Sequence, residues 1–272
     1  QHVADAVTHV GTDAAGNLDF APSGGGGTVG VALGTAGTTD QLSLTSRSEG
    51  RASGSFDINV GYGESLAIAD LGGSGQTIGA TWRGDNGVNV AVSNGGTVSS
   101  SGDLVFAAGN GRIGSNINFT VSSGGTGGGV VNVGGNFTLD ASGKSTAPAV
   151  SGGNVQLGMT GANSSITVGG LTRLDASALI ESNPNGLPTT GASTATGGSV
   201  SAAFDGGNAF FNGLQLDGSA VVDGRNNHSD VGGAATTNLT ELLVRGATVT
   251  TGNLVLNVNA SGGIGNLTGG DA

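Results

Sequence analysis

The segment Gly134-Gly135-Asn136-Phe137-Thr138-Leu139-Asp140-Ala141 carries the pattern that decides the fold. In it, apolar Phe137 and Leu139 flank polar Thr138. Because successive side chains of a β-strand point to opposite faces, the outer two positions of this triplet are expected to face a core and the middle one solvent. Asn136 is expected to form hydrogen bonds at the start of the strand. Similar triplets recur at five other places: Leu66-Ala67-Ile68, Leu104-Val105-Phe106, Thr172-Arg173-Leu174, Leu214-Gln215-Leu216 and Leu254-Val255-Leu256.

The spacing of these triplets indicates a repeat architecture. Their first residues are separated by 38, 33, 35, 42 and 40 positions, and further strand-like triplets such as Val155-Gln156-Leu157 lie in the intervals. Three short strands per period, without a helical segment, are typical of a β-solenoid, in which each strand pairs with its counterpart one coil later, about 4.8 Å away. We therefore predict an all-β parallel β-helix with three short strands per coil and about 33–42 residues per coil.

Composition supports this fold and excludes several others. Of the 272 residues 57 are glycine, which suits tight corners between strands and interrupts any long helix. The formal net charge of −11 argues against nucleic-acid binding, which needs a basic face to neutralise phosphates. The absence of cysteine excludes disulfides and thiolate zinc sites. No apolar run approaches the roughly 18 residues of a membrane-spanning helix, so no transmembrane segment is expected.

The regular pattern covers residues 51–272, whereas residues 1–50 fit it less well. We interpret residues 1–50 as irregular early coils of the same solenoid, with residues 1–10 as a candidate N-terminal cap. Polar insertions at residues 142–151, 177–197 and 218–237 follow the first strand of successive later coils. Solenoids accept loops only where stacking is preserved, so these insertions are expected on one side. That side is either a binding face or a set of solvated spacers.

Two groups of residues are candidate sites. Asp140, Asp175 and Asp217 directly follow their triplets, so in-register coils would align three carboxylates in an acidic ladder. Such a ladder would either bind Ca²⁺ or consist of solvated corner acids. The second group lies in the third insertion and is either a binding loop or a polar turn: Asp223, Arg225, His228 and Asp230. No other metal and no cofactor is predicted.

The sequence favours a protein without enzymatic activity. Pectate lyases and polygalacturonases are parallel β-helices that combine acidic residues with nearby bases. Here no two acidic residues are adjacent, the arginines are scattered, and His228 is the only histidine in the regular region. No catalytic residue is therefore predicted. A polysaccharide-active β-helix, a lyase or a glycoside hydrolase, is the alternative interpretation.

The phrases at 134–141, 152–157 and 251–256 resemble repeats of filamentous-haemagglutinin-like exoproteins and autotransporter passengers of Gram-negative bacteria. The resemblance extends over about residues 56–268. It implies a right-handed parallel β-helix, export to the bacterial cell surface, and an adhesive or structural role. We accordingly expect an extracellular segment. Because the last coil of a solenoid has an open backbone edge, we also expect the edge around residues 254–258 to be covered by another copy of the chain, head to tail in filaments or a lattice, or by residues of a longer parent chain. Cell-surface glycans and host or neighbouring cell surfaces are the expected binding partners.

Overall fold

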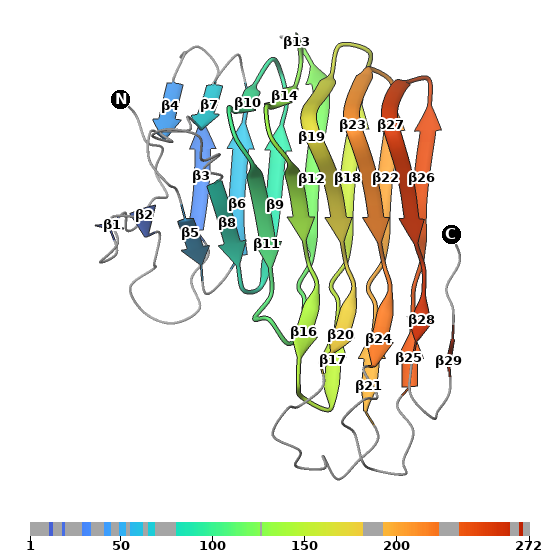
Figure 1. The fold of residues 1–272 in the computed structure, drawn as a ribbon. Coiled ribbons are helices and arrows are strands. Elements are labelled where there is room, and N and C mark those ends of the chain that lie inside the picture. The colour runs from blue at the N-terminus through green and yellow to red at the C-terminus, as the bar shows by residue number, and fades with distance from the viewer. Residues whose placement is uncertain are drawn as a thin grey trace, which may run out of the picture.

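The computed structural model describes residues 11–12, 18–19, 29–33, 41–44, 49–52, 55–61, 65–68, 80–125, 127–181, 193–222, 234–261 and 267–268. The chain is all-β, with no helix among these residues, and nearly all strand pairs are parallel. Two large sheets face each other in the upper part of Figure 1, and two small sheets form a lobe below them. Within the described residues, no helix is long and apolar enough to cross a membrane.

The chain passes repeatedly around the same path, and each such circuit contributes one strand to the first sheet. In chain order its members are β3 (Val29–Leu33), β6 (Ser55–Val60), β9 (Gly87–Val92), β12 (Ile117–Gly124), β18 (Val155–Thr160), β22 (Val200–Asp205) and β26 (Thr240–Arg245). The short strand β13 (Gly127–Gly128) pairs antiparallel with the end of β12.

The second sheet has two stacks of short strands in its N-terminal half, and these merge in its C-terminal half. One stack consists of β4 (Gln41–Leu44), β7 (Ser65–Ile68), β10 (Thr97–Ser100) and β14 (Val130–Val133). The other consists of β5 (Glu49–Ala52), β8 (Ala80–Gly84), β11 (Leu104–Ala108) and β15 (Phe137–Asp140). The long strand β19 (Ser165–Asp175) pairs with both β14 and β15, and it is followed by β23 (Asn208–Asp217) and β27 (Thr248–Asn257).

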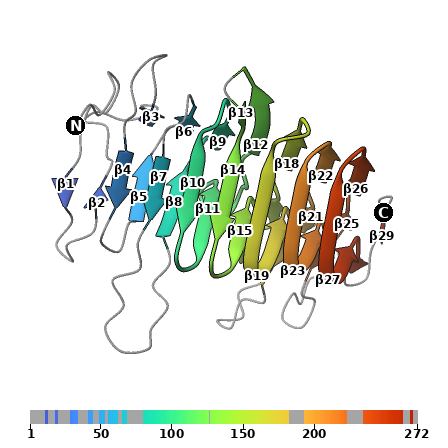
Figure 2. The same cartoon turned by 90° about the horizontal axis from the view of Figure 1, so that it is seen from above.

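Each circuit, which we call a coil, repeats the previous one in parallel register. Phe119 pairs with Val90, Val131 with Val98 and Phe137 with Leu104, so every strand of one coil lies beside its counterpart in the coil before. Seen from above, the coils follow one another along a single axis (Figure 2). This arrangement is consistent with a β-solenoid.

The core lies between the first and second sheets and follows the predicted alternation. Leu139 is fully buried while its neighbour Thr138 is only half-buried. Aromatic rings concentrate in the N-terminal half of this core, where Phe56 packs edge-on against Trp82 with ring centroids 5.0 Å apart. Phe119 and Phe137 pack in the same way at 5.1 Å. Buried aromatic pairs of this geometry add to the stability that their burial alone provides.

The corner glycines are explained by the close approach of neighbouring coils. A Cβ atom at Gly152 would collide with the carbonyl oxygen of Ala176, and one at Gly153 with that of Ser115. Both obstacles are backbone atoms of adjacent coils, which cannot move aside without breaking the stack. Glycine is therefore needed here for space.

Two expectations about the repeat are wrong in the first half. Leu66 pairs with Val98 and not with Leu104, whose partner in the preceding coil is Ala80. This coil therefore advances only 24 residues, fewer than the predicted 33–42. The error arises because both stacks of the second sheet carry apolar–x–apolar triplets, and the pattern does not distinguish them. The count of three strands per coil fits β9, β10 and β11, but later coils combine two of these strands into one and add two others.

The predicted polar insertions contain the added strands of three successive coils. One small sheet of the lobe contains β16 (Gly143–Ser145), β20 (Ala178–Ile180), β24 (Ala220–Val222) and β28 (Ala260–Ser261). The other contains β17 (Ala149–Ser151), β21 (Thr194–Thr196), β25 (Ala234–Thr236) and β29 (Leu267–Thr268). The two sheets enclose a separate apolar core: Val150, Ala178, Ile180, Ala195, Ala220, Val222 and Ala235. The described strands of the insertions lie on one side, as expected, and they are not merely solvated spacers.

Little of residues 1–50 is described. Apart from β3, β4 and the start of β5, the described part contains β1 (Gly11–Thr12) and β2 (Leu18–Asp19), which form an antiparallel pair. The parallel pairing of β3 with β6 and of β4 with β7 continues the two sheets toward the N-terminus. The candidate cap at residues 1–10 lies outside the described residues.

Candidate functional site

The three acidic residues of the predicted ladder lie in register at the corner between the second sheet and the lobe. Asp140 is the last residue of β15, Asp175 of β19 and Asp217 of β23, and each pairs with the next. Asn257 continues the same row at the end of β27. Three carboxylates therefore stack at successive strand spacings.

A serine two residues further along caps each carboxylate. Oδ1 of Asp140 accepts hydrogen bonds from the backbone nitrogen and hydroxyl of Ser142, at 2.9 and 2.5 Å. Oδ1 of Asp217 accepts the same pair from Ser219, at 3.1 and 2.6 Å. Such local hydrogen bonds from an aspartate to the backbone two residues on stabilise a turn. The acids thus stabilise the corner at which the chain leaves the second sheet for the lobe.

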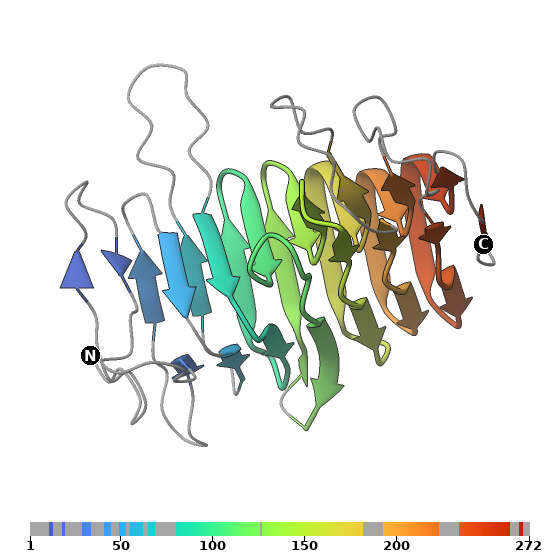
Figure 3. The same cartoon turned by 90° about the horizontal axis from the view of Figure 1, so that it is seen from below.

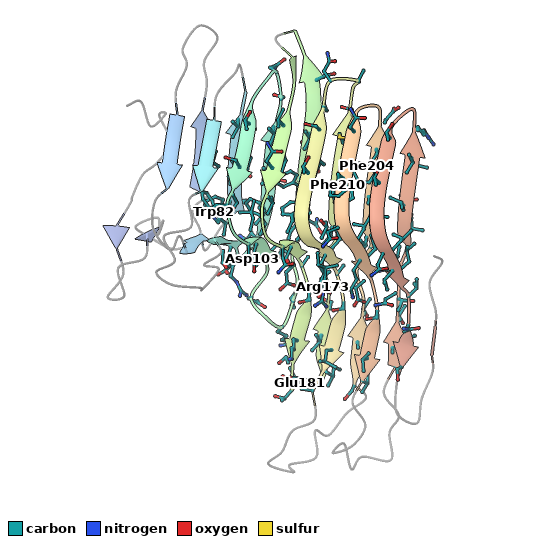
Figure 4. All side chains as sticks on the ribbon, turned by 45° about the horizontal axis from the view of Figure 1, so that its top comes forward. Trp82, Asp103, Arg173, Glu181, Phe204 and Phe210 are labelled. Atoms are coloured by element: carbon teal, nitrogen blue, oxygen red, sulfur yellow. The ribbon has the colours of Figure 1, made fainter. Side chains whose placement is uncertain are left out.

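Arg173 neutralises part of this negative charge. Its Nη2 lies 2.6 Å from Oδ2 of Asp175 and 3.8 Å from Oδ2 of Asp217. Figure 4 labels Arg173 at the junction of the second sheet with the lobe. Since residues 173 and 175 lie two apart on one strand, both side chains are on the outer side of the sheet. The guanidinium joins carboxylates of two successive coils.

Burial dominates the electrostatics of Asp175. It raises the pKa of this carboxyl group above its usual range, because the charged form loses hydration. Hydrogen bonds from Ser177 and the positive charge of Arg173 lower the pKa in part, and the negative charge of Asp140 raises it further. The folded protein therefore holds a proton on Asp175 to higher pH than an unfolded chain does.

The oxygen atoms of this row are largely engaged within the protein. Ca²⁺ takes six to eight oxygen ligands in most protein sites, whereas here serine donors and Arg173 occupy much of the ligand capacity. Among the described residues, no group of three histidine, cysteine or acidic side chains is placed to hold a metal ion. The arrangement fits a structural corner better than a Ca²⁺ ladder, which stays a prediction.

The second predicted group has no described geometry. Asp223, Arg225, His228 and Asp230 all lie within residues 223–233, outside the described residues. Whether this segment is a binding loop or a polar turn stays a prediction.

At the starts of several strands, asparagine and aspartate side chains form hydrogen bonds to the backbone of a neighbouring coil. The sequence analysis predicted such hydrogen bonding only for Asn136. Oδ1 of Asn136 accepts a hydrogen bond from the backbone nitrogen of Leu171 at 2.9 Å, and the backbone nitrogen of Asn136 donates to Asp103 at 2.7 Å. Asn154 accepts in the same way from Ser199 at 3.0 Å. The expected hydrogen bonding of Asn136 is thus present, and the recurring Gly-Gly-Asn phrase was the available signal for Asn154.

Phe210 was also missed as a surface residue. It is 49% exposed on the outer side of β23, whereas every other aromatic residue with a described side chain is buried. Figure 4 labels Phe210. Its register partners on the neighbouring coils are Thr167 and Thr250, both exposed. The available signal was the alternation in Ala209-Phe210-Phe211, which places the middle residue outward.

No family model, no curated protein and no solved structure matches this chain.

Proposed function

We propose that the chain is a β-solenoid that serves as a non-enzymatic structural and adhesive segment of a secreted bacterial surface protein. The observation that carries the proposal is the use of the polar side chains. In the described part, Asp140 and Asp217 accept hydrogen bonds from the serine two residues on, and Arg173 joins Asp175 to Asp217 of the next coil. These side chains are therefore used to stabilise the corner and the stack of coils. Catalysis instead requires groups that are free to contact a substrate and rigidly positioned toward it.

Composition and the repeat resemblance support the export that we propose. The chain contains no cysteine, and its resemblance to bacterial exoprotein repeats implies a place on the cell surface. Immunolabelling of intact cells of the source organism tests this part. Labelling only after cell lysis would contradict it.

The adhesive role is supported by the outer side of the second sheet around Phe210. The exposed ring has threonine hydroxyls on the two neighbouring coils, and Asn208 and Asn212 are exposed on its own strand. An aromatic face surrounded by neutral hydrogen-bonding groups suits a saccharide, whose C–H faces stack on the ring while its hydroxyls bond to the rim. We therefore propose a neutral surface glycan as the ligand.

A glycan-binding experiment tests this assignment. We expect the protein to bind immobilised neutral glycans and the Phe210→Ala variant to lose at least tenfold in affinity. Thr250→Ala, a change on the next coil, is expected to have a smaller effect. Binding that is equal for the intact protein and Phe210→Ala would contradict the assignment.

A turnover assay separates the proposed function from the enzymatic alternative. The protein is incubated with acidic and neutral polysaccharides, with and without Ca²⁺, and new chain ends are measured. We expect none. Turnover that is abolished by Arg225→Ala or His228→Ala would show a polysaccharide-active enzyme and overturn the proposal.

A further inference from the structure

The last described coil exposes positions that are buried in every earlier coil whose side chains are described. Val244 on β26 is 45% exposed, whereas its register partner one coil earlier, Phe204, is 1% exposed. Leu254 on β27 is 46% exposed, whereas its partner Leu214 is fully buried. Both residues occupy core-facing rows of their sheets. They are exposed because no described coil follows to cover them.

The backbone of this coil has an open edge as well. β26 is the last strand of the first sheet and β27 the last of the second, and among the described strands each pairs on one side only. Figure 3 shows these strands, in red, at the end of the stack opposite the blue N-terminal strands. Unpaired strand edges next to exposed apolar residues favour pairing with another strand.

The N-terminal end of the same two sheets has the complementary sequence. β3 and β4 are the first described strands of their stacks. Val31 and Leu33 lie in register with the buried Ile58 and Val60, and Leu42 with the buried Leu66. Apolar residues therefore occupy the core-row positions of β3 and β4.

We infer that the end coil formed by β26 and β27 is the docking surface for β3 and β4 of a second copy of this chain. This inference rests on the proposed structural role. Because the coils of each sheet are parallel, a copy displaced along the stacking axis presents its strands in the direction that continues both sheets. If the register of the strand pairs continues across the contact, Leu33 of the second copy follows Val244 in its row, and Leu42 follows Val249.

This register determines how two copies are oriented at the contact and whether the contact can repeat. A symmetric contact between two C-terminal ends would place β26 antiparallel to β26 of the other copy. The parallel rows of core-facing residues would then not continue across the contact. The head-to-tail contact is heterologous and leaves one open end on each copy, so it repeats without closing. The expected product is a filament that grows with protein concentration.

Light scattering over a concentration series tests the inference with two adjacent residues of β26. We expect the 272-residue chain to increase in mass with concentration and the Val244→Lys variant to stay monomeric. Leu243→Lys is the matched control, because Leu243 is 37% exposed but lies in the outward-facing row with Ala203. It is expected to assemble as the unmodified chain does. Equal loss of assembly in both variants would indicate non-specific association through exposed apolar residues and would overturn the inference.

A mixing experiment tests the complementary end. Leu33→Lys is also expected to be monomeric, but a mixture of Val244→Lys and Leu33→Lys is expected to form a dimer of one copy of each. Each variant keeps one intact end, and only the head-to-tail contact uses both. Circular dichroism establishes that both variants fold; if one does not, Leu42→Lys replaces Leu33→Lys, or Leu242→Lys replaces Val244→Lys.

The alternative outcomes are distinct. An unmodified chain that is monomeric at every concentration would overturn the inference and favour a further coil of a longer parent chain as the cover. A mixture that stays monomeric although both variants fold would also overturn it. The mass measurement tests only the contact between copies, whereas the polysaccharide assay tests the proposed function. Failure of the inference can therefore be distinguished from failure of the proposed function.

Discussion

Nη2 of Arg173 lies 2.6 Å from Oδ2 of Asp175, its neighbour on the same side of β19. The same nitrogen lies 3.8 Å from Asp217 on the following coil. One guanidinium thus compensates two carboxylates that strand pairing forces into one row. Without it, the pairing that stabilises the backbone would bring uncompensated negative charges together.

We expect Arg173→Met to destabilise the protein. The substitution keeps an apolar side chain of similar length but leaves the carboxylates of Asp175 and Asp217 uncompensated. Because Arg173 is 42% exposed, solvent screening limits the loss to about 1 kcal/mol in the free energy of unfolding. Urea denaturation measures this change.

Lys144→Met is the control, since the Lys144 Nζ–Glu181 Oε1 pair, at 3.0 Å, is well exposed on both sides. It is expected to change stability by less than about 0.5 kcal/mol. Equal effects of the two substitutions would contradict the special role of Arg173.

Asp175→Asn is expected to change the pH dependence of stability. Since burial raises the pKa of Asp175 above 3.8, its usual value, the folded chain binds this proton more tightly than the unfolded chain. This contribution to stability is fully present below pH 3.8 and is lost as the pH rises through the raised pKa. The variant lacks the contribution, so its stability relative to the unmodified protein is expected to increase across that pH window.

Denaturation at a series of pH values measures this difference. Ser177→Ala serves as a companion, because the Ser177 hydroxyl lowers the pKa of Asp175 in part. Its loss should raise the pKa and move the window to higher pH. A difference between Asp175→Asn and the unmodified protein that stays constant with pH would disprove the predicted linkage.

Thr172→Val is expected to stabilise the protein. Thr172 is fully buried in the row that contains Phe137 and Leu214, and its hydroxyl oxygen has no hydrogen-bond partner among the described residues. A buried hydroxyl without a partner costs about 1–3 kcal/mol, and valine has nearly the same shape without the polar atom. Thermal unfolding should therefore occur at higher temperature. Thr138→Val, in the outward row, is the control and is expected to have little effect.

Ile180→Ala is expected to loosen the lobe while leaving the main core intact. Ile180 belongs to the small separate apolar core, whereas Leu139 belongs to the large core between the two main sheets. Hydrogen exchange in Ile180→Ala should accelerate in β16, β20 and β24, because small clusters open locally. Leu139→Ala should instead lower global stability by about 2–5 kcal/mol. Uniform acceleration in Ile180→Ala would show that the lobe and main core unfold as one unit.

The sequence by itself determined the strand faces. The alternation of Phe137, Thr138 and Leu139 predicted which side chains are buried, because the two-residue period of a strand is a local property. The spacing of the aspartates likewise placed Asp140, Asp175 and Asp217 in one row, since in that region the triplets align with strands that do pair.

Only the tertiary structure decided which strands are partners. Leu66 carries the same triplet as Leu104, yet it pairs with Val98, because pairing depends on contacts between residues distant in the chain. The lobe was hidden for the same reason: Val150 and Ala178 are isolated in polar segments and form a core only when successive coils stack. Arg173 could be matched to Asp175 from their spacing of two residues, but its approach to Asp217 depends on the register between β19 and β23. Local alternation determines which face of the sheet a side chain occupies. Only the stacking of segments distant in the chain determines which residues it contacts on that face.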